Sequence, residues 1–294
     1  MAKLKIQFTL FSAFYSPLIF TMSGGFLEEE GLDYEWSIAE SGRTAIDALV
    51  EGSAEVVQTA PSQSFGPISR GEKTSWAHFA QINEMDGFFI SGREVDPDFS
   101  WKKLEGAEVV MFSGGQPNAM FRYACHKAGI DYDRIKPITP GGASAIDAAF
   151  RNGQGRYVLQ QGPFPQQLHS EGIGHILSQV GPWIGPNAFS SLAAKRDWLE
   201  TSEAVAFSRA YRKTRIYINE APAAEIAASE RQFFPDVDQA ALVDCIDTYQ
   251  KLGCWTPHPE ITREAFDVAQ DVFIYSGIFN DKIDYETAVV LPPA

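Results

Sequence analysis

The sequence predicts an α/β protein of two lobes, each a mostly parallel sheet flanked by helices, with a ligand cleft between the lobes. Three observations lead to this prediction. The chain has 294 residues, more than one hydrophobic core usually holds. Strand-like and helix-like segments alternate along it. The pattern Gly-x-[Thr/Ser]-Ala-Ile-Asp-Ala occurs twice, in SGRTAIDALVEG from Ser41 and in GGASAIDAAFRNG from Gly141.

The sequence that precedes the two copies also repeats, in the same order. GLDYE begins at Gly31 before the first copy, and GIDYD begins at Gly129 before the second. Ordered matches of this kind indicate a duplicated structural unit rather than chance.

Each unit is predicted to run strand, helix, strand, helix, strand. Hydrophobic periodicity and glycine stop signals give the boundaries. In the first unit they predict a strand over 5–11, a helix over 17–30, a strand over 34–38, a helix over 44–51 and a strand over 54–59. In the second unit the same order falls at 109–112, 117–129, 135–139, 143–153 and 156–161. Gly31 is expected to end the first helix in a left-handed conformation.

Charge and cysteine content exclude several kinds of partner. The formal net charge is −14, which disfavours nucleic acid and anionic membranes, although a small anionic ligand stays compatible with it. The three cysteines form no disulfide framework, and Cys254-x-x-x-His258 has no second pair at zinc-ligand spacing. We expect no metal and no cofactor.

The N-terminal segment imitates a signal peptide, with Lys3 and Lys5 before an apolar run from Phe8 to Met22. Cleavage there would remove the first strand of the first repeat unit, so we interpret the segment as structural. Ser16-Pro17 interrupts the run well short of a membrane-spanning length. We therefore expect neither a signal peptide in this chain nor a membrane span.

Polar loops follow the predicted strands, where ligands bind in open parallel sheets. The expected ligand-binding residues are Ser12, Phe14, Tyr15, Ser16, Gly42, Arg43, Thr59, Ser62, Gln63, Asn83, Ser113, Gly114, Gly115, Gln116, Asn118, Gln160 and Gln161. Adjacent amides are costly to bury unpaired, so Gln160 and Gln161 are the strongest candidates. Phe14 and Tyr15 suit either ligand stacking or the core, and Ser113 suits either a ligand contact or a helix cap.

GFLEEEGLDYE from Gly25, Gly42 with 45–49, and WKKLEGAEVVMFSGG from Trp101 resemble a known family. It is the type II periplasmic solute-binding proteins, in the branch of sulfonate, nitrate and thiamine-precursor binders. The resemblance implies a first lobe of 1–85 plus 190–294 and an inserted second lobe of 86–189. Two hinge crossings, near 83–93 and 183–194, would join them, with the tail from Arg196 packed on the first lobe. It also implies hinge closure on a small-molecule ligand, a monomer, an ABC permease as partner and a periplasmic location, although the cytoplasm also fits a chain without a signal peptide.

The expected cleft is rich in amides, hydroxyls and aromatics, with Arg43 as its only cation. Such a lining suits a heteroaromatic, thiamine-precursor-like solute, while a sulfonate would need helix N-termini and Arg43. The alternative is an enzyme on the same scaffold, a lyase, hydrolase or desulfinase, with His78 or Tyr15 as proton donor. The resemblance does not carry over the chemistry of the related fungal pyrimidine synthase or desulfinase. The synthase's histidine position is Gln63 here, and the first loop lacks the desulfinase's cysteine.

Overall fold

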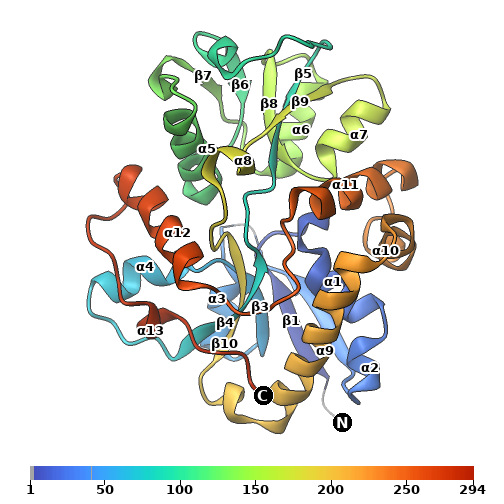
Figure 1. The fold of residues 1–294 in the computed structure, drawn as a ribbon, viewed down its shortest axis with the longest axis vertical. Helices are drawn as coiled ribbons and strands as arrows, with labels where there is room; N and C mark the ends of the chain where they lie inside the picture. The colour runs from blue at the N-terminus through green and yellow to red at the C-terminus, as the bar shows by residue number, and fades with distance from the viewer. Residues whose placement is uncertain (1–2, 41) are drawn as a thin grey trace.

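The computed structural model describes residues 3–40 and 42–294; Ser41, which opens the first repeat motif, lies outside them. The chain forms two α/β lobes, one above the other in Figure 1, and so confirms the predicted fold class. The first lobe contains a five-stranded sheet in the order β2-β1-β3-β10-β4. Its strands are β1 (Leu4–Phe8), β2 (Tyr34–Ile38), β3 (Val56–Thr59), β4 (Trp76–Asn83) and β10 (Ser190–Lys195).

The second lobe contains a five-stranded sheet in the order β7-β6-β8-β5-β9. Its strands are β5 (Phe88–Gly92), β6 (Glu108–Val110), β7 (Lys136–Ile138), β8 (Tyr157–Gln161) and β9 (His175–Gln179). The three strands of each repeat unit pair in parallel. The next strand in each order, β10 or β5, pairs antiparallel with both of its neighbours, so both sheets are mixed.

The helices of the repeat units also follow the predicted order, with one difference. The first lobe contains α1 (Ser16–Ser23), α2 (Phe26–Glu29), α3 (Ala45–Glu51) and α4 (Ser62–Ser69). The second contains α5 (Gly115–Lys127), α6 (Ala143–Arg151), α7 (Phe164–Ser170) and α8 (Gly181–Ile184). The single helix predicted over 17–30 is wrong. It is divided into α1 and α2, because Gly25 adopts φ +82°, a left-handed conformation that interrupts an α-helix. Gly31 follows α2 with φ +74°, as predicted.

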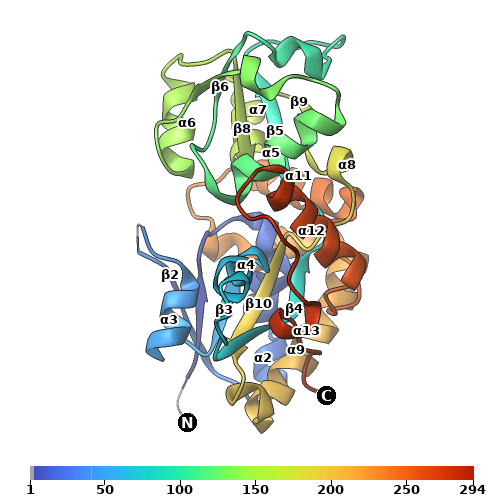
Figure 2. The same cartoon turned by 90° about the vertical axis from the view of Figure 1, so that its left-hand side faces the viewer.

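The chain crosses between the lobes twice, once from β4 to β5 and once from β9 to β10. The remaining C-terminal helices are α9 (Ser202–Glu220), α10 (Ala223–Glu230), α11 (Gln239–Leu252), α12 (Arg263–Tyr275) and α13 (Tyr285–Ala288). This tail packs on the first lobe, and two of its helices also contact the second lobe. Helices α9 and α10 pack on α1, whereas α11 also packs on α7 and α12 on α5, both in the second lobe. In Figures 1 and 2, α11 and α12 lie at the level where the lobes meet.

The main hydrophobic core is continuous from lobe to lobe. It includes Phe8 and Phe14 from the first lobe, Phe89 and Phe121 from the second, and Trp255 from the segment between α11 and α12. All five are essentially buried. Within the described residues, no helix has an apolar run long enough to cross a membrane.

Candidate ligand-binding site

A solvent-open cavity of about 190 Å³ lies between the two lobes. We call it the polar chamber, because side chains with hydroxyl or amide groups predominate in its wall. The first lobe and the second lobe each supply strand ends and the start of a helix, and the return crossing supplies the rest. The lining residues are Thr9, Leu10, Tyr15, Gln58, Thr59, Ala60, Gln63, Phe88, Gln116, Pro117, Gln161, Phe189 and Ser190.

A narrower hollow of about 20 Å³ adjoins the polar chamber, and we call it the apolar annex. Leu10, Phe88 and Gln161 line both spaces. The other annex residues are Phe11, Ser12, Phe112, Ala143, Ile146, Gln160, Gly162 and Phe164. Within residues 3–40 and 42–294, neither lining contains a charged side chain.

Two polar side chains reach the polar chamber from equivalent strands of the two lobes. Thr59 is the last residue of β3, and Gln161 is the last residue of β8. These strands occupy the same third position in the two sheet orders. The duplicated unit therefore directs one polar side chain from each lobe into the same space.

Both of these side chains are buried without partners. The Thr59 hydroxyl and both amide atoms of Gln161 have no hydrogen bond, although the residues are only 2% and 6% exposed. The amide oxygen of Gln160, next to the annex, is also unpaired, while its Nε2 donates to Asp147 Oδ1 at 3.3 Å. Buried polar atoms in native proteins nearly always have a partner, so these groups require one, which a water or a bound molecule can supply.

Gln58, in contrast, is used to build the chamber wall. Its Oε1 accepts from the backbone amides of Thr9 at 3.0 Å and Leu10 at 3.1 Å. The Thr9 hydroxyl in turn accepts from the amide of Ala45, at the start of α3, at 2.9 Å. These bonds fix the loop after β1 against β3 and α3, and so hold Leu10 at the border of the chamber and the annex.

Burial shifts the pKa of two groups near the cleft: Tyr15, which lines the chamber, and Asp86, which lies just before β5 and lines neither space. Burial raises the pKa of the Tyr15 phenol above its ordinary value, although a contact with the Gln161 side chain lowers it in part, so this hydroxyl stays protonated at physiological pH. Burial raises the pKa of the Asp86 carboxyl to about 7. Its Oδ1 accepts from the amide of Phe88 at 2.7 Å, and its Oδ2 has no partner. Burial therefore opposes the charged form of each of these two side chains.

The structure brings only part of the predicted site together. Tyr15, Thr59, Gln63, Gln116 and Gln161 line the polar chamber, and Ser12, Gln160 and Gln161 line the annex. Three predicted residues line neither space and form hydrogen bonds with other parts of the protein. The Ser16 hydroxyl is hydrogen-bonded to the carbonyl of Ala13 and the carboxyl of Glu230, Asn83 donates to Ser190, and Asn118 donates to Tyr132.

The other predicted residues lie outside both linings. Phe14 is fully buried against Phe189 and Tyr249. Ser62 lies one step back from the cleft, since its hydroxyl donates at 2.8 Å to Oε1 of Gln116, whose Nε2 donates to the carbonyl of Phe189. The exposed residues that line neither space are Gly42, Arg43, Ser113, Gly114 and Gly115.

Arg43 does not supply a cation to either space. Its guanidinium pairs with Glu51 and, at 3.8 Å, with Asp47, both on α3. The side chains of all three residues are more than two-fifths exposed. An anionic ligand in the cleft would therefore lack the arginine that the sequence suggested for it.

His78 lies in the core of the first lobe and lines neither space. Its Nε2 is 2.8 Å from the Ser64 hydroxyl, and its Nδ1 is 2.8 Å from the Ser191 hydroxyl. Burial lowers the pKa of the imidazole to about 3. The suggestion that His78 donates a proton in the cleft is wrong, because the ring is enclosed and both of its nitrogens are occupied.

Sequence reasoning missed the aromatic and aliphatic walls of the cleft. Phe88 and Phe189 lie on and beside the crossing segments, while Phe11 and Phe112 follow β1 and β6. Apolar periodicity gives these residues the same signal as core residues, so it could not identify them.

A chain of hydrogen bonds joins the lobes beside the cleft. Ser12 Oγ donates to the carbonyl of Gly162 at 2.5 Å, and the amide of Gly162 donates to the Tyr249 hydroxyl at 2.7 Å. That hydroxyl donates to the carbonyl of Gly87 at 3.0 Å. Gly87 fits there because a Cβ atom would lie 2.4 Å from the ring of Phe14. Tyr249 of α11 thus connects the first crossing to the end of β8.

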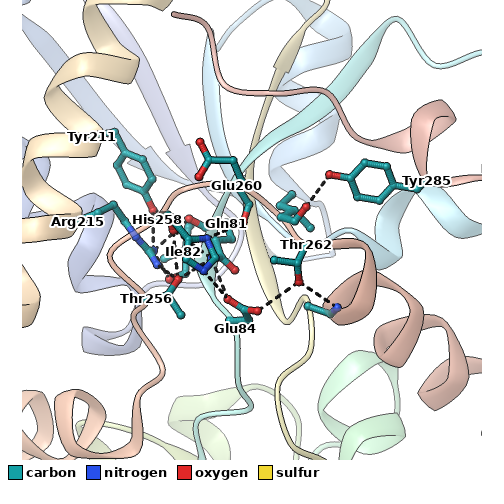
Figure 3. Close-up of polar contacts among 12 residues, drawn as sticks. Gln81, Ile82, Glu84, Tyr211, Arg215, Thr256, His258, Glu260, Thr262 and Tyr285 are labelled. Atoms are coloured by element: carbon teal, nitrogen blue, oxygen red, sulfur yellow. Dashed lines mark hydrogen bonds and ion pairs between the residues drawn. The ribbon is translucent and has the colours of Figure 1, made fainter.

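A buried polar network fixes the base of the first crossing (Figure 3). The guanidinium of Arg215 donates to the carbonyls of Ile82 at 2.7 Å and Gln81 at 3.2 Å. It also donates to Thr256 at 2.9 Å. The amide of Gln81 donates to Glu84 Oε2 at 3.0 Å. Helix α9 and the 253–262 segment therefore hold the end of β4 where it leaves the first lobe.

Two mixed α/β lobes, joined by two crossings and enclosing a cavity at their strand ends, define the class: the periplasmic binding protein fold. The sequence matches the NMT1-like family over residues 2–230, and the chain belongs to this family. The resemblance predicted from the sequence is thereby confirmed.

Known proteins of this class resemble the chain over nearly its whole length. The putative binding protein YtlA of Bacillus subtilis (strain 168) is 28% identical over 293 residues, which cover 98% of this chain and 88% of YtlA. The ligand-binding component of an ABC-type import system from Staphylococcus aureus, solved with zinc bound, superposes with a TM-score of 0.77 at 14% identity, covering 99% of this chain and 97% of its own. The alkanesulfonate-binding protein SsuA from Xanthomonas axonopodis pv. citri, solved bound to MOPS, gives a TM-score of 0.74 at 15% identity and 99% coverage of both chains.

Proposed function

We propose that this protein is the solute-binding component of an ABC-type import system and holds one small organic solute in the polar chamber. The observation that carries the proposal is the buried side chain of Gln161 at the wall of an interlobe cavity, where its amide makes no hydrogen bond of ordinary geometry and only approaches the Tyr15 phenol. A solute with a donor and an acceptor would pair both atoms. The names of the S. aureus and X. axonopodis neighbours support the same class of function.

The proposed solute is an uncharged heteroaromatic compound of the thiamine-precursor type. Neutral amides and hydroxyls satisfy ring nitrogens and carbonyls without leaving a charge unpaired. A sulfonate would carry its negative charge into a lining with no cation, since Arg43 pairs on the surface of α3. Sulfonate-like solutes are therefore the second candidate.

The proposal includes a mode of action. The protein would act as a monomer. Its two lobes would close on the solute by bending at the two crossings, the first lobe being 1–85 plus 190–294 and the second 86–189. The closed protein would then deliver the solute to an ABC permease from outside the cytoplasmic membrane. The network around Arg215 supports a hinge that starts beyond Ile82, because it holds the backbone before that point.

Native mass spectrometry of freshly purified protein, followed by denaturation and identification of released compounds, tests the proposal. We expect one uncharged ring compound per chain. Where none is retained, titration calorimetry with uncharged heteroaromatic compounds and with alkanesulfonates follows. Binding of alkanesulfonates alone would select the second candidate. A bound compound that the protein converts would favour an enzyme on this scaffold, and no binding at all would overturn the proposal.

A further inference from the structure

The apolar annex extends the polar chamber at one side. Leu10, Phe88 and Gln161 belong to both walls, so a molecule in the chamber lies directly beside the annex. Phe11, Phe112 and Phe164, together with Ala143 and Ile146, supply the apolar part of the remaining wall. The annex is thus a small, mainly carbon-lined space that shares part of its wall with the ligand cavity.

The size and lining of the annex limit what it can accept. Its volume of about 20 Å³ exceeds the roughly 10–15 Å³ that a single water needs, and is far below the roughly 150 Å³ of a cavity that binds benzene. A ring therefore fits the polar chamber of about 190 Å³ but not the annex. A group the size of a methyl matches the annex.

A water in the annex would find unpaired side-chain partners only at Gln160 and Gln161. A buried water needs two to four polar partners. The hydroxyl of Ser12 is already committed, since it donates to the carbonyl of Gly162 and accepts from the amide of Phe14. The other polar side chains in the annex wall are the amides of Gln160 and Gln161, and Gln161 also faces the chamber.

We infer that the solute has two parts: an uncharged ring that occupies the polar chamber and pairs with Gln161, and one methyl-sized apolar substituent that occupies the annex. The inference rests on the proposed function and adds the substituent that the annex selects. Removing one methyl group from water on binding strengthens affinity roughly fourfold. The annex therefore discriminates between otherwise identical rings.

Titration calorimetry with matched pairs of rings tests the inference. The probes are uracil and thymine, cytosine and 5-methylcytosine, and pyrimidine with its 2-methyl and 4-methyl derivatives, with methanesulfonate as the anionic comparison. We expect one methyl position at which the methylated ring binds the wild-type protein about fourfold more tightly than its parent.

Substitutions in α6 assign this gain to the annex. Ala143 lines the annex, so Ala143→Leu fills it and should abolish the methyl preference. Ala148→Leu makes the same change at an exposed position of the same helix and should keep the preference. Ile146→Val enlarges the annex by one methyl group and should move the preference from methyl to ethyl, which gives a second test if Ala143→Leu does not fold.

The outcomes separate the inference from the proposed function. Equal binding of parent and methylated rings at every position would overturn the inference, as would a methyl preference that survives in Ala143→Leu. Either result leaves the proposed function intact. Binding of methanesulfonate alone overturns the inference while a solute-binding role stands. If no ring and no sulfonate binds, both are overturned.

Discussion

Replacing Gln161 with leucine should weaken solute binding without weakening the fold. A buried polar atom without a partner costs about 1–3 kcal/mol, and Gln161 has two such atoms. Leucine removes both and keeps most of the volume. We expect the free energy of unfolding of the solute-free protein to stay unchanged or to rise by up to about 2 kcal/mol. Loss of two hydrogen bonds of about 1 kcal/mol each should reduce solute affinity about thirtyfold.

Gln58→Leu is the matched control, because Gln58 is also a buried glutamine in the same wall. Its Oε1 accepts from the amides of Thr9 and Leu10, so leucine leaves the Leu10 amide without that partner. This substitution should lower the free energy of unfolding by about 1–3 kcal/mol. The two changes are chemically identical and should act in opposite directions on stability.

Urea unfolding of the solute-free proteins measures the first effect, and titration calorimetry with the solute found by mass spectrometry measures the second. The reasoning is refuted if Gln161→Leu destabilises the solute-free protein as much as Gln58→Leu does. It is also refuted if Gln161→Leu binds the solute as tightly as the wild type.

Three further predictions concern stability, and urea or thermal unfolding checks each. The pKa of Asp86 is about 7 in the folded protein against 3.8 for an ordinary carboxyl. Its contribution to the free energy of unfolding is therefore fully present below about pH 4 and is lost as the pH rises to 7. The wild type should lose about 4 kcal/mol of its free energy of unfolding between those pH values, and Asp86→Asn should not. The same pH profile in both proteins would contradict this. The pKa of His78 is about 3 in the folded protein against 6.5 for an ordinary imidazole, so its contribution to the free energy of unfolding is present above about pH 6.5 and is lost as the pH falls to 3. In His78→Gln the free energy of unfolding should fall less steeply over this range, and an equally steep fall would contradict the prediction. Gly87→Ala should cost about 1–3 kcal/mol, because the new Cβ would overlap the ring of Phe14, whereas an unchanged melting temperature would show that the ring moves freely.

Much of the fold could be predicted from the sequence because the same order of strands and helices occurs twice in the chain. Every strand of the two repeat units was predicted, and so was α6, which begins at Ala143. The errors came from effects beyond local periodicity. The break between α1 and α2 depends on Gly25 adopting a positive φ, and the backbone conformation of a glycine inside an apolar run cannot be predicted from its neighbours. The position of α11 and α12 against both lobes depends on tertiary packing, which amphipathic patterns do not specify.

The site was less predictable than the fold, for a related reason. Polar residues after strands are a usable signal, and Thr59 and Gln161 reach the cavity as such residues should. The same signal fails for Asn118, whose amide donates to Tyr132, and for Arg43, whose guanidinium turns back to Glu51. Sequence position places a residue near a cleft, whereas its hydrogen-bond partners decide whether it is free to bind a solute.

The duplication explains why the unpaired groups lie where they do. In each repeat unit the third strand ends in two polar residues, Gln58-Thr59 in β3 and Gln160-Gln161 in β8. The first of each pair is bonded within its own lobe, Gln58 to Thr9 and Leu10, and Gln160 to Asp147. The second of each pair faces the shared cavity and lacks a partner. The last residue of each third strand thus faces the same cavity from opposite lobes, and one molecule lying between the lobes can pair with both.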